Sequence, residues 1–199
     1  TRIDSGRMTL SPVRPPFATW LAWDLAQTQA RVHWARATED VAYDAGKVSG
    51  YYYSERANPQ LSPDGTHVVW TPNAGTLRAT STATGATHVI GKNFRRPIGW
   101  ESSRQFNPIS VGGQVAYEGY VDDNRDALMI TTLTSDGTST KVAHQWPDSA
   151  AQVYGARYYG EALVAITDVY EYTGALRWWK PGEPERTLVQ GAYASSFQY

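Results

Sequence analysis

The chain has 199 residues, a formal net charge of -1 at pH 7 and no cysteine. It has no block of like charges, so it lacks the basic surface that nucleic acids and anionic membranes attract, and we expect no nucleic-acid partner. Without cysteine there are neither disulfides nor thiol chemistry. No run of eighteen apolar residues occurs, so we expect no membrane span. Eight Trp, thirteen Tyr and seventeen Gly beside only two Met favour short strands and turns over helices.

The amino terminus begins with Thr1 instead of Met and has no apolar signal core. We expect that a leader such as a signal peptide has been removed or that the sequence is part of a longer chain. A secreted or periplasmic protein is the expectation that follows, with a cytoplasmic location as the alternative.

The first predicted elements are two strands, residues 19–25 and 30–35, joined by a turn at 26–29. Residues 24–45 are also rich in good helix formers, so a helix is the competing interpretation. We favour strands because ARVHW, residues 30–34, alternates at the period of two that is typical of a half-buried strand. By their position in the chain, the two strands correspond to the last two strands of a repeat that recurs further on.

The next predicted element is the bend of a hairpin at Ser62–Gly65, with the sequence SPDG. Proline has the backbone angle that the second position of a type I turn needs, and Ser, Asp and Gly suit the first, third and fourth positions. Thr66–Trp70 follows it and is β-branched or aromatic at most positions, so it is predicted to be the second strand of the hairpin.

From this turn on, the chain repeats one order of parts three times: an inner strand, two middle strands, a turn and an outer strand. Leu21, Leu77, Leu128 and Leu176 recur at intervals of about fifty residues, close to the roughly 40–50 residues of a four-stranded propeller blade. The predicted inner strands are 58–62, 106–111 and 152–158, the middle strands are 67–72, 76–82, 114–120, 127–133, 162–168 and 175–180, and the outer strands are 87–91, 140–144 and 186–190.

The predicted fold is therefore all-β and β-propeller-like, with about four four-stranded blades in a single domain of residues 1–199. Strands that are apolar on both faces, such as ALVAI at 162–166, suit a sheet that other sheets cover on both sides. The chain forms either a closed four-bladed ring or an arc of a larger propeller. The predicted units are 1–37, 58–91, 106–144 and 152–190, with a strand at 193–199 that completes the first unit.

The Ser62–Gly65 turn and the Asp136–Gly137 turn, with the apolar strands around them, resemble the WD-like repeats of the TolB-type β-propeller family. Two units depart from this pattern, at Val111–Gly113 and at Tyr158–Gly160. The resemblance implies a propeller. It selects no function, because such propellers serve as scaffolds, as substrate gates of serine peptidases and as ligand-binding modules.

The four histidines, His33, His67, His88 and His144, are the first candidates for metal or acid–base chemistry. All except His67 fall on the predicted last strand of a unit, so they are spread around the rim of the propeller and do not converge on one ion. We expect no metal and no cofactor, and the sequence selects no catalytic set.

The segment DDNRD at 122–126 has the oxygen ligands that calcium prefers. Its spacing is wrong for an EF-hand, because from Asp122 the sixth position is Ala127 and the twelfth is Leu133. We interpret it as a solvated turn between the second and third strands of a blade.

Loops between blades and loops between second and third strands share one face of a propeller, and aromatic side chains beside arginines are typical of binding surfaces. We predict a non-catalytic binding or scaffold module that holds a protein or peptide partner at this face. The alternatives are a carbohydrate-binding lectin and the propeller domain of a hydrolase or lyase. The predicted contact residues are Arg95, Arg96, Trp100, Tyr120, Asp122, Asp123, Trp146, Tyr170 and Tyr172.

Overall fold

The computed structural model describes residues 2–3, 9–10, 17–23, 29–48, 59–62, 64–73, 75–97, 110, 113–122, 125–134, 137–145, 154–170 and 173–193. All regular structure in these residues is β-strand, and neighbouring strands pair antiparallel, which confirms the predicted all-β fold. No helix in the described part of the chain has the length and apolar character that crossing a membrane requires. The chain divides into two compact units, residues 1–92 with 133–138 and residues 93–132 with 139–199.

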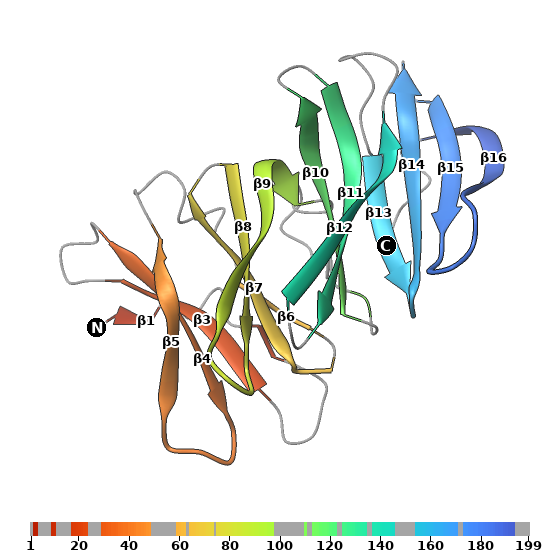
Figure 1. The fold of residues 1–199 in the computed structure, drawn as a ribbon. Helices are drawn as coiled ribbons and strands as arrows, with labels where there is room; N and C mark the ends of the chain where they lie inside the picture. Colours follow the sequence, from red (N-terminus) through yellow and green to blue (C-terminus); the bar gives the residue numbers. More distant parts are fainter. Residues whose placement is uncertain are drawn as a thin grey trace. The chain divides into compact units, whose positions relative to one another are not determined.

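The first sheet contains the strands predicted at 19–25 and 30–35 and three further strands. β1 (Arg2–Ile3) and β2 (Thr9–Leu10) pair with β3 (Phe17–Trp23), and the sheet continues through β4 (Ala30–Arg36) to β5 (Ala42–Val48) (Figure 1). The helix considered for residues 24–45 is wrong, because its described residues are strand and turn.

β5 corrects the sequence-based assignment of the first unit. Its residues were predicted to connect two blades, but they pair with β4, so β3 and β4 are the second and third strands of the sheet and not the last two. Leu21 therefore lies on a second strand, whereas Leu77, Leu128 and Leu176 lie on third strands; Val32 of β4 has the corresponding place. The sequence AYDAGKV does not alternate, and only Ala45 and Val48 of it are buried, so periodicity gave no signal.

The second sheet has seven strands in the order β12-β11-β10-β9-β8-β7-β6. Its strands are β6 (Gln60–Leu61), β7 (His67–Asn73), β8 (Gly75–Ser81), β9 (Thr87–Pro97), β10 (Gln114–Asp122), β11 (Arg125–Thr134) and β12 (Gly137–Gln145). The predicted middle and outer strands of this region are confirmed. The predicted inner strand at 106–111 lies outside the described residues except for Ser110.

β9 is longer than predicted and has two partners. It begins beside β8, and its last residues pair with β10, where Phe94 is opposite Gly119 and Arg96 is opposite Glu118. Residues 92–97 were predicted to be a loop between blades, and this prediction is wrong because they complete the edge of β10.

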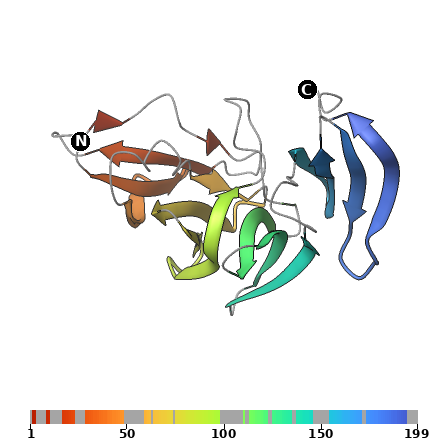
Figure 2. The same cartoon turned by 90° about the horizontal axis from the view of Figure 1, so that it is seen from above.

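The third sheet has the four strands predicted for the last unit. β13 (Tyr154–Tyr159), β14 (Ala162–Tyr170), β15 (Thr173–Trp179) and β16 (Arg186–Tyr193) follow one another in chain order. They lie side by side as the blue strands of Figure 1 and Figure 2. The strand predicted at 193–199 lies outside the described residues apart from Tyr193, which ends β16.

Each compact unit has its own apolar core. Leu163 and Ile166 lie on opposite faces of β14 and both are buried, as predicted for a strand covered on both sides. The core of the first unit contains Leu21, Ala30, Val32, Trp34, Ala45, Val48, Leu61, Val68 and Trp70. The core of the second contains Ala116, Ala127, Leu128, Ile130, Ala156, Leu163, Ala165 and Trp179.

The predicted turn at Ser62–Gly65 is confirmed by its hydrogen bonds. The amide of Gly65 donates to the Ser62 carbonyl at 2.8 Å, and the amide of His67 donates to Ser62 Oγ at 2.9 Å. The Ser62 amide in turn donates to the His67 carbonyl at 2.9 Å, so one buried serine closes the turn three times.

Ser110 repeats this arrangement where the sequence pattern departs from it. The amide of Gly113 donates to the Ser110 carbonyl at 3.0 Å, and the amide of Gln114 donates to Ser110 Oγ at 2.9 Å. Gly65 and Gly113 both have a positive φ, 72° and 69°. The turn at Ser110 is thus one residue shorter than the turn at Ser62, because its serine Oγ accepts from the amide four residues later and not five. Both turns share a Ser-x-x-Gly spacing.

Candidate functional site

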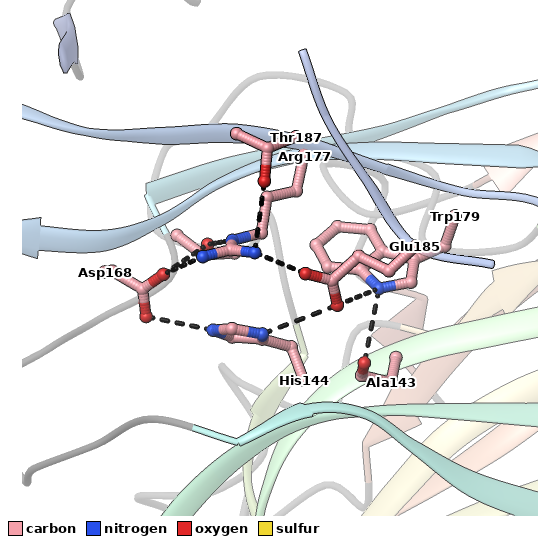
Figure 3. A network of polar contacts seen from close by, with 8 residues as sticks. Ala143, His144, Asp168, Arg177, Trp179, Glu185 and Thr187 are labelled. Atoms are coloured by element: carbon pink, nitrogen blue, oxygen red, sulfur yellow. Dashed lines mark hydrogen bonds and ion pairs between the residues drawn. The ribbon is translucent and has the colours of Figure 1, made fainter. Parts of the chain in front are cut away.

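A cluster of charged side chains lies on the third sheet and on β12 (Figure 3). His144 comes from β12, Asp168 from β14, Arg177 from β15, and Glu185 from the turn directly before β16. Side chains two residues apart on a strand share a face, so Arg177 and Trp179 of β15 both point to the side of the sheet where β12 lies.

His144 is placed between two carboxylates. Its Nε2 lies 2.9 Å from Oδ1 of Asp168, and its Nδ1 lies 3.5 Å from Oε2 of Glu185. The side chain is only 14% exposed. A neutral imidazole donates one hydrogen bond and an imidazolium donates two, so only the protonated ring donates toward both carboxylates.

Arg177 joins the same two carboxylates from the other side. Its Nη2 donates to Oδ2 of Asp168 at 2.9 Å, and its Nη1 donates to Oε1 of Glu185. Its Nε donates to Oγ1 of Thr167 at 2.9 Å. The guanidinium is therefore held on both edges, and such charge-assisted hydrogen bonds are stronger than neutral ones.

Trp179 connects the cluster to the apolar core of the second unit. Its ring packs in that core, and its Nε1 lies 3.0 Å from Oε2 of Glu185 and 3.3 Å from the carbonyl oxygen of Ala143 on β12. The indole N–H of Trp179 thus makes polar contacts with β12 and with Glu185, while the rest of the ring is buried in the core.

Asp168 has a strained backbone. Its φ is 55°, and it is the one residue other than glycine with a positive φ in the described part of the chain. The pairing of β14 with β15 shifts register between Thr167 and Tyr170, so Asp168 lies in a bulge that changes the direction of its side chain. Such strain costs about 1–3 kcal/mol and persists only where surrounding contacts offset it.

Gly174 allows this bulge to form. A Cβ at this position would lie 2.5 Å from the carbonyl oxygen of Thr167 and 2.9 Å from side-chain atoms of Ile166 and Val169. No side chain fits at that distance from a backbone oxygen. The close approach of β15 to the bulged strand thus requires glycine.

Opposing effects act on the pKa of the Asp168 carboxyl. Burial raises this pKa, but the hydrogen bond and charge of His144, followed by those of Arg177, outweigh the burial and leave it below its usual range. The ionised carboxylate is therefore the form that the cluster favours. The arrangement is suited to fastening β12 to the third sheet by charge.

The positions of the histidines are partly as predicted. His88 and His144 lie on β9 and β12, the strands predicted as the last of their units, but His33 lies on β4, the third strand of its sheet, because β5 was missed. His144 is not an isolated side chain at the rim. Burial lowers the pKa of His67, and nearby Asp64 opposes this change.

The structure gives backbone positions for five of the nine predicted contact residues. Arg95 and Arg96 lie on β9 and not in a loop, Tyr120 and Asp122 lie on β10, and Tyr170 ends β14. Pairing of β9 with β10 brings Arg96 opposite Glu118, two residues before Tyr120. The other four lie outside the described residues: Trp100, Asp123, Trp146 and Tyr172.

Sequence reasoning missed the charged cluster. His144 was interpreted as a rim residue, and the acids and the arginine were treated only as parts of strands and turns. One signal was present: Gly75–Arg78 reads GTLR and Gly174–Arg177 reads GALR, so an arginine recurs at one place in two repeats.

No protein-family model matches the chain, and no curated protein matches it. Solved structures do match it. A prolyl endopeptidase matches 93% of this chain with a TM-score of 0.61 and 15% identity. The β-propeller domain of the Trilobed protease from Pyrococcus furiosus, described as having an open velcro topology, matches 93% with a TM-score of 0.53 and 13% identity. Prolyl oligopeptidase B from Galerina marginata matches 87% with a TM-score of 0.51 and 9% identity.

At these identities the likeness shows the fold alone, which is β-propeller-like as predicted. The chain covers 29% of the prolyl endopeptidase, 58% of the Trilobed protease domain and 25% of the Galerina marginata enzyme. A TolB-type propeller in particular is not confirmed.

Proposed function

We propose that the chain is the propeller portion of a peptidase and that the residues that cleave the peptide bond lie outside it. The supporting observation is the match of 93% of the chain to a prolyl endopeptidase at a TM-score of 0.61. The other two structures described above also come from peptidases. This is the hydrolase alternative of the sequence-based prediction, and it has more support than a free-standing binding module.

In this role the propeller borders the path of the peptide, and the loop face predicted from the sequence is the proposed place of contact. Arginine side chains suit peptide carboxylates, and tyrosines give apolar contact at low entropic cost. Arg96 is a less direct test of this face than a loop residue, because its backbone is part of the pairing of β9 with β10. Tyr120→Ala and Asp122→Ala are better probes of peptide binding.

A biotinylated fluorophosphonate, which labels the nucleophile of serine hydrolases, tests the proposal in extracts of the native source. After labelling, proteins are captured on avidin and washed under denaturing conditions. We expect recovery of tryptic peptides of this sequence, such as residues 126–141, and loss of that recovery after heating the extract before labelling.

The isolated 199-residue chain is the control, because it is expected to take no label and to hydrolyse no peptide. In the labelled extract, failure to recover tryptic peptides of this sequence after both denaturing and native washing contradicts the proposal. Recovery under native washing alone contradicts a catalytic domain on the same polypeptide.

A further inference from the structure

Arg78 of β8 is a half-buried cation with no anionic partner in the described part of the chain. Its Nε is buried and lacks a hydrogen-bond acceptor, and its Cζ lies 5.6 Å from the ring centroid of Trp70. Trp70 is fully buried, and its Nε1 donates to Oγ1 of Thr80 at 3.0 Å, which fixes the ring beside the guanidinium. A buried charged donor without an acceptor is destabilising and calls for an explanation.

The third sheet contains the same arginine with its partners present. Arg78 and Arg177 each end a Gly-x-Leu-Arg sequence on the third strand of a β-meander, β8 and β15. Arg78 is opposite Trp70 on the preceding strand, as Arg177 is opposite Ala165. Arg177, however, contacts two carboxylates through its Nη2 and Nη1 groups. Its Nε donates to Thr167, two residues after Ala165, and the corresponding position around Arg78, two residues after Trp70, is Pro72, which has no hydroxyl.

The positions that carry those carboxylates are uncharged around Arg78. Asp168 follows the cross-strand partner of Arg177 by three residues, and Asn73 follows the cross-strand partner of Arg78 by the same number. Glu185 directly precedes β16, and Ala86 directly precedes β9.

The neighbouring strand β5 supplies no other carboxylate for Arg78. A Cβ at its Gly46 would lie 2.6 Å from the Trp70 ring, so this strand passes close to the ring. Its one acid, Asp44, is paired with Arg31 at 2.5 Å and accepts a hydrogen bond from the Gly46 amide at 2.8 Å. The acid on this side of Trp70 is thus already engaged.

We infer that Arg78 is a binding site for a carboxylate from outside the chain, which takes the place that Asp168 and Glu185 have beside Arg177. A carboxylate fits because the N–H groups of a guanidinium match the spacing of its two oxygens. Its source is either a peptide, through an acidic side chain or a free carboxyl terminus, or a small free acid. The inference is independent of the proposed peptidase role.

The test is an NMR titration of the 199-residue chain with ¹⁵N-labelled arginine side chains. The probes are succinate and two acetylated peptides of equal sequence, one with a free terminal carboxylate and one with an amide. We expect saturable movement of the Arg78 Nε–H signal with the free-carboxylate peptide and none with the amide, while the Arg177 signal stays in place. A parallel response to succinate identifies a site for any carboxylate, and no response to succinate identifies a peptide site.

Arg78→Gln should weaken binding of the free-carboxylate peptide about tenfold or more, because it removes a charge-assisted hydrogen bond. Arg186→Gln, which removes an exposed arginine of β16, is the control and should leave the binding unchanged. Equal binding by wild type and Arg78→Gln, or equal binding of the carboxylate and amide peptides, overturns the inference.

Ala86→Glu keeps Arg78 and supplies a carboxylate at the position of Glu185, so it tests the site even if Arg78→Gln does not fold. We expect a higher unfolding midpoint and loss of peptide binding. If Ala86→Glu binds the free-carboxylate peptide as tightly as wild type does, the proposed carboxylate site beside Arg78 is contradicted.

Discussion

Asp168 is the residue at which backbone strain and charge coincide. Its φ of 55° is unfavourable, yet it points a carboxylate at both His144 and Arg177. Sequence alone shows an aspartate at the end of an apolar strand and gives no reason to expect a bulge there. The bulge depends on Gly174 of the next strand and on the cations that face it, so it follows from tertiary contacts and not from local propensity.

Asp168→Asn is expected to lower the free energy of unfolding by about 1–3 kcal/mol at pH 7, because it removes the carboxylate that pairs with Arg177 and faces Nε2 of His144. Asn tolerates a positive φ as well as Asp does, so the change isolates the charge. The pKa of Asp168 is lowered in the folded state, so its contribution is complete above the ordinary carboxyl pKa of 3.8 and is lost as the pH falls below that value.

Urea unfolding between pH 7 and pH 2.5 measures this contribution. The difference between wild type and Asp168→Asn should be present between about pH 5 and pH 7 and shrink toward zero below the ordinary carboxyl pKa. Asp40→Asn, at an exposed turn position, is the control and should differ little from wild type throughout. A difference that persists unchanged at pH 2.5 would show that the Asp168 charge is not its source.

Strands were predictable where they alternate or are apolar throughout, as in β7, β8, β11, β14 and β15, and β16 was predictable from its place in the repeat. β5 and the end of β9 were not, because their stability comes from pairing and from contacts made elsewhere. AYDAGKV of β5 exposes most of its residues and becomes a strand because Ala45 and Val48 pack in the first core. The end of β9 has two adjacent arginines, a composition typical of a loop, and is ordered by β10.

Gly46→Ala tests the packing of β5. Gly46 has a φ of 142°, and a Cβ there would lie 2.6 Å from the Trp70 ring. We expect a loss of about 2–4 kcal/mol in unfolding free energy, from backbone strain together with a clash in a close-packed core.

Gly85→Ala is the matched control for this loss. Gly85 has a positive φ of 73° but nothing within 4 Å of a Cβ, so its substitution should cost only about 1 kcal/mol. Chemical denaturation of both variants gives the comparison. Equal losses would mean that the β5–Trp70 contact does not form as described.

At the scale of the whole molecule, the repeat of about fifty residues was enough to predict a propeller-like fold. The charged cluster was not predictable, because its contacts join residues 24 and 36 positions apart, on strands whose facing sides no periodicity reveals. Whether the nine predicted contact residues form one surface depends in the same way on which loops lie close together, so that surface remains a prediction. The central claim is that His144 and the third sheet form one charged interface that stabilises the fold.

A double-mutant cycle on His144 and Asp168 tests that claim most directly. The unfolding free energies of wild type, His144→Ala, Asp168→Asn and the double variant give the coupling between the two side chains, and the exposed pair Arg31 and Asp44 gives a reference cycle. We predict a coupling of about 1–2 kcal/mol for His144 and Asp168 at pH 6, larger than that of the exposed pair. A coupling within about 0.3 kcal/mol of zero, with additive single losses, would contradict the account.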